Sequence, residues 1–120
     1  MAVRAVRGAI QVEANDRDII REASAELVQA VLDRNDIDPE DMISVLFTVT
    51  LDLDTEFPAV GARQVGLTQV PLMCATEIPV PGALARVIRL MAHIETSKSR
   101  AELHHVYLRG ATALRPDLAQ

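Results

Sequence analysis

The sequence predicts an α+β fold in which helices cover one face of a mixed β-sheet. Two strand-like segments rich in β-branched residues are each followed by a segment with helical character. The C-terminal half instead alternates strand-like segments with turns, as hairpins do. The chain has 120 residues and is 49% hydrophobic, which suits one core but not two. We therefore expect a single domain over residues 1–120.

The first two predicted elements are a strand and a helix. Residues 3–12 are expected to form the strand, because the β-branched side chains of Val6, Ile10 and Val12 share one parity. Asn15 is the expected N-cap of the helix, which ends near Asn35. The apolar residues at helical spacing, which should face the core, are Ile20, Ala23, Leu27 and Val31.

The middle of the chain is expected to repeat this order. After a turn at 38–41, residues 43–50 are uncharged and rich in β-branched side chains, which predicts a strand covered on both faces. The acidic segment 51–56 is expected to be a loop. Phe57-Pro58 should then begin a short helix that ends near Val65, because proline is tolerated in a first helical turn.

The C-terminal half is expected to hold three strands. A short one at 70–73 leads into a loop at 77–82, where two prolines and a glycine prevent a regular ladder. A brief helical turn then precedes the longest strand, at 86–96. A turn at 97–103 leads to the last strand, at 105–108. From about residue 112 the chain should be a mobile tail with few apolar anchors.

Composition excludes several classes of protein. Seventeen acidic and 12 basic residues give a formal net charge of −5, which disfavours binding to nucleic acid or to anionic membranes. One cysteine excludes an internal disulfide and suits a reducing compartment. No segment has the length and apolar character of a signal peptide or a membrane span. We expect a cytoplasmic protein, and its apolar surplus indicates self-association.

The first candidate functional residues are arginines inside apolar strands. Arg4 and Arg7 lie on the first predicted strand, and Arg86 and Arg89 lie on the longest one. Because side chains alternate along a strand, each pair should place one arginine on either face of the sheet. At least one arginine per strand should therefore reach a partly enclosed site that binds anions. Structural ion pairs at the strand ends would explain these residues equally well.

Other candidates for catalysis or metal binding are weaker. Cys74 precedes Glu77 in a kinked segment, but no histidine nearby completes a nucleophilic pair, so a structural cysteine is favoured. His104 and His105 are adjacent and should point in opposite directions, which predicts no metal site. Tyr107 is typical of a half-buried tyrosine at a sheet rim. No glycine-rich phosphate loop follows a strand.

Several segments in order along the chain resemble one family. They are RAVRGA (4–9), FPA (57–59), VPLMC (70–74), VIRLM (87–91), HVYL (105–108) and LRPDL (114–118). Together they resemble the monofunctional, AroH-type chorismate mutases over nearly the whole chain. The resemblance implies a homotrimeric pseudo-α/β-barrel like that of the bacillus enzyme, with active sites at the subunit interfaces. It also implies that chorismate is converted to prephenate in phenylalanine and tyrosine biosynthesis, without a metal or cofactor.

The resemblance also implies a role for individual residues. Arg89 would donate hydrogen bonds to the ether oxygen and a carboxylate of the substrate, and Arg7 and Tyr107 would hold the side-chain carboxylate. Glu77 would accept a hydrogen bond from the ring hydroxyl. The remaining residues expected to bind substrate are Phe57, Ala59, Arg63, Leu72, Met73, Cys74, Leu114 and Arg115. Val60 stands where some relatives carry a basic residue, so the rim is expected to be less positive here.

Two other classes would also fit a small trimeric α+β chain with an arginine at a subunit cleft. One is the RidA-type imine deaminases and ligand-binding proteins, and the other is an oligomeric binding module without catalytic activity. Glu77, Arg89 and Tyr107, together with the LRPDL segment, favour the mutase over both.

Overall fold

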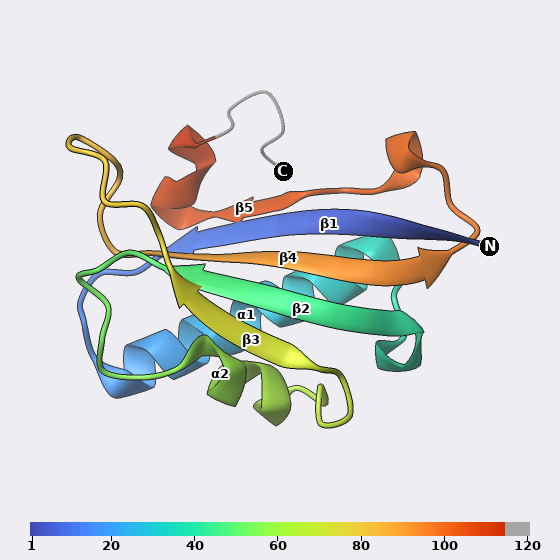
Figure 1. The fold of residues 1–120 in the computed structure, drawn as a ribbon, viewed down its shortest axis with the longest axis horizontal. Helices are drawn as coiled ribbons and strands as arrows, with labels where there is room; N and C mark the ends of the chain where they lie inside the picture. Colours follow the sequence, from blue (N-terminus) through green and yellow to red (C-terminus); the bar gives the residue numbers. More distant parts are fainter. Residues whose placement is uncertain (115–120) are drawn as a thin grey trace.

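A single mixed sheet organises the chain, in the strand order β3-β2-β4-β1-β5 (Figure 1). The structure, a computed structural model, describes residues 1–114. The strands are β1 (Ala2–Gln11), β2 (Met42–Val49), β3 (Leu72–Thr76), β4 (Val87–Thr96) and β5 (Val106–Leu108). The long strand β4 lies at the centre and pairs antiparallel with both β1 and β2. The outer pairs β1–β5 and β2–β3 are parallel, which confirms the prediction of a mixed sheet.

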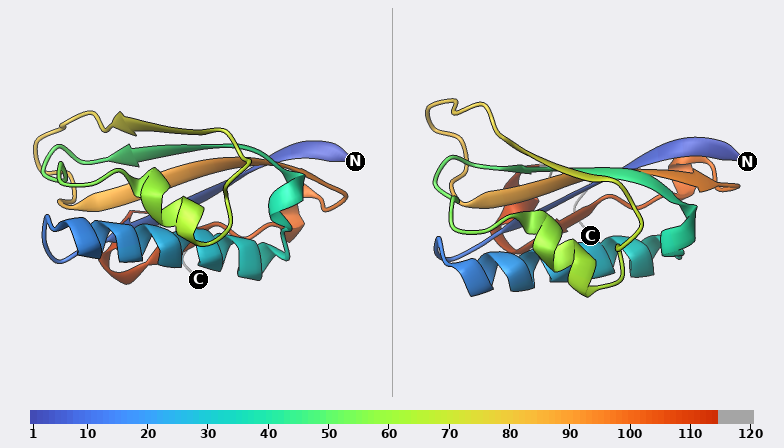
Figure 2. Two further views of the ribbon diagram at one scale, coloured as in Figure 1. Left: turned by 90° about the horizontal axis from the view of Figure 1, so that it is seen from below. Right: turned by 60° about the horizontal axis from the view of Figure 1, so that its bottom comes forward.

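Both α-helices cover the same face of the sheet, as predicted (Figure 2). Helix α1 (Arg17–Asn35) packs its apolar stripe into the core, where Ile20, Ala23, Leu27 and Val31 are all buried. The predicted N-cap was one residue too early. Asp16 has the extended backbone of a cap, and its carboxylate accepts a hydrogen bond from the Ile19 N–H at 3.0 Å.

The short helix α2 (Pro58–Gln64) packs directly against α1. Gly61 permits this close approach, because a Cβ at this position would lie 2.4 Å from the carbonyl oxygen of Arg21. Phe57 immediately precedes the helix and Pro58 occupies its first turn, so the predicted helix start is confirmed. The two α-helices form one layer and leave most of the other face of the sheet open, except where Tyr107 and Ala111 pack against Ala9 and Val87.

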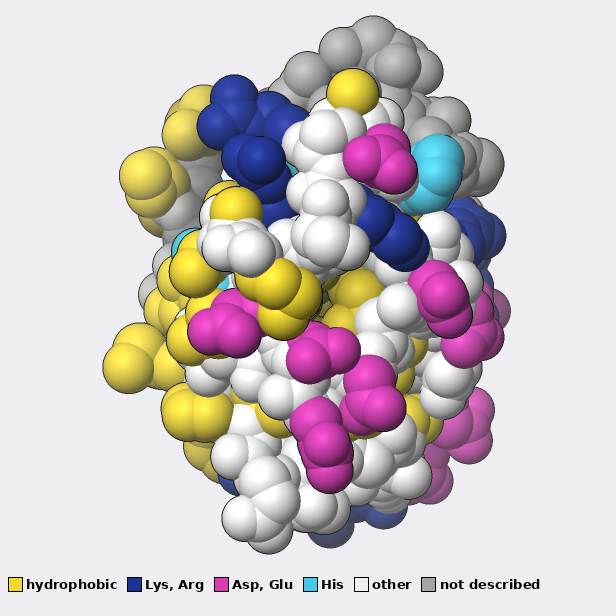
Figure 3. All heavy atoms as spheres, turned by 90° about the vertical axis from the view of Figure 1, so that its right-hand side faces the viewer, with side chains coloured by type: hydrophobic (Ala, Val, Ile, Leu, Met, Phe, Trp, Pro, Cys, Tyr) yellow, Lys and Arg dark blue, Asp and Glu magenta, His cyan; other side chains and the backbone are white. Residues whose placement is uncertain are grey.

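Strand β2 exposes an apolar side chain on this open face. Val45 and Phe47 are buried against the helices, whereas Leu46 on the other face is 40% exposed. The prediction that both faces of this strand are covered is therefore wrong for the single chain. Hydrophobic side chains gather along the left-hand edge of Figure 3, where the open face is seen edge-on.

Two strand boundaries differ from the predictions because of local backbone chemistry. Strand β3 begins at Leu72, since Pro71 has no N–H to donate, although its carbonyl accepts from the Val45 N–H at 3.0 Å. The segment before β4 contains no helical turn. Arg86 has a left-handed backbone with φ of 53°, and its N–H donates to the carboxylate of Asp52 at 3.1 Å. Arg86 therefore precedes the strand and does not belong to it.

Three short 3-10 helices complete the described chain. They are η1 (Pro39–Asp41), η2 (Arg100–Glu102) and η3 (Arg109–Ala113). The last of them occupies the start of the segment predicted as a tail, and residues 115–120 of that segment lie outside the described residues. Within residues 1–114, no helix has the length and apolar character that crossing a membrane requires.

Candidate active site

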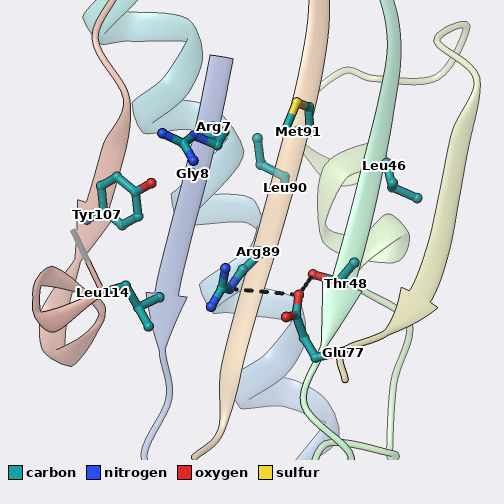
Figure 4. Close-up of a pocket in the computed structure, with 10 residues that line it drawn as sticks. All are labelled: Arg7, Gly8, Leu46, Thr48, Glu77, Arg89, Leu90, Met91, Tyr107 and Leu114. Carbon is teal, nitrogen blue, oxygen red and sulfur yellow. Dashed lines mark hydrogen bonds and ion pairs between the residues drawn. The ribbon is translucent and has the colours of Figure 1, made fainter. Parts of the chain in front are cut away.

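A cavity of about 340 Å³ opens on the open face of the sheet. It lies over β1, β4 and β2, and its walls reach β5 and the segment after β3 (Figure 4). Its lining residues are Arg7, Gly8, Leu46, Thr48, Glu77, Arg89, Leu90, Met91, Tyr107 and Leu114. This cationic cavity has the size of a site for a small organic molecule.

Sheet register brings the two arginines of this cavity together. Arg89 on β4 pairs with Ala9 on β1, and Arg7 pairs with Met91, so the two arginines are diagonal neighbours on one face. The other two arginines singled out in the sequence have structural contacts instead. The Nε of Arg4 donates to the Lys98 carbonyl at 3.4 Å, and the Nε of Arg86 donates to the Val12 carbonyl at 3.0 Å.

Arg89 faces a carboxylate across the cavity. Its Nε lies 3.8 Å from Oε2 of Glu77, which directly follows β3 and whose N–H donates to the Val49 carbonyl at 2.8 Å. The Thr48 hydroxyl donates a hydrogen bond to the same Oε2. Arg89 is not buried in its strand, because its side chain is 47% exposed in the single chain. Its guanidinium is therefore accessible to a ligand from the open face.

Arg7 and Tyr107 form the opposite side of the cavity. The N–H of Arg7 donates to Nδ1 of His105 at 2.9 Å, which ties β1 to the start of β5 beside the cavity. Tyr107 pairs with Ala9 in the parallel register, and its hydroxyl points towards Arg7 (Figure 4). The tyrosine is only 5% exposed, so it is more buried than predicted.

The charges of the cavity suit an anionic ligand with an apolar body. Two guanidinium groups, from Arg7 and Arg89, face one carboxylate, from Glu77. Leucine and methionine side chains supply the apolar part of the lining. A site of this composition can hold carboxylates by charge-assisted hydrogen bonds while it excludes water from the rest of the molecule.

A second hollow, the edge cavity, contains other residues predicted from the sequence. It has a volume of about 400 Å³ and is lined by Arg17, Val49, Leu53, Asp54, Thr55, Glu56, Phe57, Pro58, Cys74, Ala75 and Thr76. Cys74 pairs with the buried Phe47 and so faces the helices, away from Arg89. Phe57 is 68% exposed, so it does not anchor its helix within the chain.

Four other residues predicted to bind substrate are on α2 and β3, the elements beside the edge cavity, but do not line it. Ala59 is buried in α2 and Arg63 is exposed on the same helix. Leu72 and Met73 are on β3, and Met73 is 67% exposed on the open face. Leu114 lines the cationic cavity, and Arg115 lies outside the described residues.

Comparison with known proteins gives one consistent family. The family model described as "Chorismate mutase type I" matches residues 3–118 of the chain. This chain belongs to the type I chorismate mutase family. It is 49% identical to the chorismate mutase AroH of Thermus thermophilus over 97% of this chain and 96% of that protein.

A second relative and a solved structure agree with this family. The chain is 35% identical to the chorismate mutase AroH of Bacillus subtilis (strain 168), over 99% of this chain and 94% of that protein. The structure of a chorismate mutase from Clostridium thermocellum matches with a TM-score of 0.90 and 44% identity, over 92% of this chain and 98% of that one. The predicted fold class and family are therefore confirmed.

In this member of the chorismate mutase family, sequence reasoning missed several lining residues of the cationic cavity. Gly8, Leu46, Thr48, Leu90 and Met91 were not singled out. Thr48 matters most, because its hydroxyl contacts Glu77. Its position opposite Arg89 depends on the register between β2 and β4, which no local pattern reveals.

Within residues 1–114, no group of three or more His, Cys, Asp or Glu side chains is placed to hold a metal ion.

Proposed function

We propose that this chain converts chorismate to prephenate by a concerted rearrangement, in the biosynthesis of phenylalanine and tyrosine. Membership of the type I chorismate mutase family over residues 3–118 supports the reaction. The observation that carries the site is the convergence of Arg7, Glu77, Arg89 and Tyr107 in one cavity. These four residues come from separate parts of the sequence and meet only through the sheet.

The chemistry of this reaction requires little beyond such a cavity. A carbon–carbon bond forms while an ether carbon–oxygen bond breaks, in one step, so neither a nucleophile nor a proton transfer is needed. The protein accelerates the step by holding the folded conformer of a flexible dianion and by stabilising negative charge on the ether oxygen. Arg7 and Arg89 supply the positive charge for both tasks.

Arg89 is the proposed donor to the ether oxygen. Within the described residues, its only ionic contact is from Nε to Glu77, at 3.8 Å, so its two terminal nitrogens remain available to a ligand. Tyr107 and Arg7 would bind a substrate carboxylate on the opposite side. Glu77 would accept a hydrogen bond from the ring hydroxyl of chorismate.

We further propose that the active enzyme is a homotrimer with each site shared between two chains, in a pseudo-α/β-barrel. Two observations support this assembly. The open face exposes apolar side chains, including Leu46 and Met73, which indicates an interface. The residues expected to bind one substrate are also divided between the cationic cavity and the edge cavity.

In the proposed trimer, the edge of one chain completes the cationic cavity of the next. Phe57 and Cys74 would then line a wall of a neighbour's site, and Arg63 and Arg115 would lie at its rim. We place this enzyme in the cytoplasm, because its one cysteine suits a reducing compartment.

The decisive test is an assay of the purified protein with chorismate. The absorbance of chorismate should fall, and prephenate should be the product, identified by its acid-catalysed conversion to phenylpyruvate. Light scattering on the same sample should give the mass of three chains. Preparations that leave chorismate unchanged would refute the reaction, and an active monomer would refute the shared site.

A further inference from the structure

Thr48 is a polar residue of the cationic cavity to which the rearrangement itself assigns no task. It lies on β2 directly opposite Arg89 on β4. Its hydroxyl donates to Oε2 of Glu77, the same oxygen that lies 3.8 Å from Nε of Arg89 (Figure 4). One carboxylate oxygen therefore has two competing partners, a neutral hydroxyl and a guanidinium.

The distance between Glu77 and Arg89 shows which partner holds the oxygen. A charge-assisted hydrogen bond between a guanidinium and a carboxylate normally spans about 2.7–2.9 Å. The observed distance of 3.8 Å between Nε of Arg89 and Oε2 of Glu77 is well beyond that range. The sheet nevertheless holds Arg89 on β4 and Glu77 after β3 within reach of each other. Glu77 thus stops short of a direct hydrogen bond with Arg89 while it is bonded to Thr48.

The backbone of Glu77 does not explain this separation. Its N–H is bonded to the Val49 carbonyl at 2.8 Å, which holds the main chain next to β2. Beyond the Cα atom, rotation about three side-chain bonds would let the carboxylate reach the nearby guanidinium. The Thr48 hydroxyl is the only hydrogen-bond donor to the Glu77 carboxylate among the described residues.

We propose that Thr48 is a positioning residue that holds the Glu77 carboxylate away from Arg89. The terminal nitrogens of Arg89 then stay free for the substrate, and Glu77 stays oriented for the ring hydroxyl. This inference rests on the proposed function and adds a residue to its machinery. A closed Arg89–Glu77 pair would have to be broken in every catalytic cycle.

Two substitutions of Thr48 separate the role of its hydroxyl from that of its shape. Its β-branched side chain favours a strand, so Thr48→Val preserves shape and strand preference while it removes the hydroxyl. Thr48→Ser retains the hydroxyl and removes only a methyl group. Ser44, on the same face of β2 but outside the cavity, offers a matched control for the loss of a hydroxyl.

The first experiment compares steady-state kinetics of these variants with chorismate. Thr48→Val should lower kcat by about 10-fold to 100-fold, the usual effect of losing a hydrogen bond to a charged group, with a smaller change in KM. Thr48→Ser should restore most of kcat, and Ser44→Ala should behave as the wild type. A Thr48→Val enzyme with wild-type kcat would overturn the proposal.

A double-mutant cycle separates positioning from a general structural role. In a Glu77→Gln background no carboxylate remains to close on Arg89, so Thr48→Val should cause little further loss. If Thr48→Val lowers kcat by the same factor with and without Glu77, the hydroxyl does not act through that carboxylate and the proposal fails.

Crystal structures of the unliganded wild type and Thr48→Val provide a test that does not depend on activity. A Glu77 carboxylate that moves to within hydrogen-bond distance of Arg89 in the variant would support the proposal. An unmoved carboxylate would overturn it. A wild type without mutase activity would instead refute the proposed function, and the two structures would still decide the role of Thr48.

Discussion

The two cavities of this chain differ in how firmly the fold holds their residues. The cationic cavity lies over the middle of the sheet, where Arg89 is on a strand paired on both sides. The edge cavity lies beside β3, which is paired on one side only, and its Phe57 is largely exposed. Arg89, the proposed donor to the ether oxygen, is thus on the most constrained strand of the sheet.

This difference suggests distinct roles for the two cavities in the proposed reaction. The cationic cavity contains charges that can act on a reacting bond, so changes there should lower kcat. In the proposed trimer, the edge cavity would contribute mainly shape and apolar surface, so changes there should affect binding or assembly. The two cavities can contribute to one site only if two chains meet.

Removal of the Arg89 side chain should lower kcat more than any other change considered. Loss of one preorganised donor at a developing charge typically costs about 3–4 kcal/mol, so Arg89→Ala should lower kcat by at least about a few hundred-fold while the trimer persists. Kinetics with chorismate and light scattering would measure both. Arg4→Ala, which removes an arginine from the same sheet outside both cavities, is the control. Near-normal turnover by Arg89→Ala would refute its central role.

Mixed trimers test whether the two cavities belong to different chains of one site. Arg89→Ala damages the cationic cavity, and Phe57→Asp places a repelling charge in the edge cavity, so each homotrimer should be nearly inactive. Co-expression of the two variants should restore about a quarter of the sites, because random assembly pairs one intact half with the other at that frequency.

The matched control for this experiment pairs two variants of the same cavity. Arg7→Ala mixed with Arg89→Ala should restore nothing, because every site then lacks one of the two arginines. Recovery in this control, or no recovery with Phe57→Asp, would contradict a site divided between chains in this way.

Cys74 provides a smaller and more discriminating test of the edge cavity. Cys74→Ala should retain most of its activity, because the rearrangement needs no nucleophile and the thiol only lines a wall. Measurement of kcat/KM together with circular dichroism would distinguish lost chemistry from lost folding. A folded variant without activity would revive a nucleophilic role for this residue.

The sequence predicted much of the fold because periodicity reports burial directly. The helical stripe from Ile20 to Val31 was predicted in this way and is present. The strand around Arg89 was also predicted and is present. Choices between neighbouring candidates were harder. Asn15 and Asp16 are both good caps, and only the contacts show that Asp16 caps α1 while Asn15 bonds to Asp54 at 2.7 Å.

The site was less predictable because it depends on strand pairing. Alternation placed one of Arg86 and Arg89 on each face, but Arg86 has a left-handed backbone outside the strand, so that argument did not apply. The position of Thr48 beside Glu77 follows from a register that links segments far apart in sequence. The expected burial of β2 on both faces also failed within one chain, where Leu46 is 40% exposed; the proposed trimer would cover this face.

The smallest predicted effect concerns the stability of the edge cavity in acid. Arg21 donates to the Glu56 carboxylate at 2.8 Å, and the Phe57 N–H donates to its other oxygen at 3.0 Å. The first of these contacts is the main reason that the pKa of Glu56 lies below its ordinary value. A carboxylate whose pKa is lowered by folding stabilises the fold above its unfolded-state pKa, and this contribution disappears as the pH falls through the folded-state value.

Glu56→Gln should therefore be less stable than the wild type at pH 7. The difference should shrink as the pH falls from the unfolded-state pKa of Glu56 towards its lowered folded-state pKa, and it should vanish below that value. Urea denaturation at fixed protein concentration would measure it, because the midpoint of an oligomer depends on concentration. Glu22→Gln, on the exposed side of α1, is the control for the loss of a surface carboxylate outside this ion pair. If both variants lose the same free energy of unfolding at pH 7 and in acid, the Arg21–Glu56 pair does not stabilise the loop before α2. The edge cavity would then owe its shape to packing and not to this ion pair.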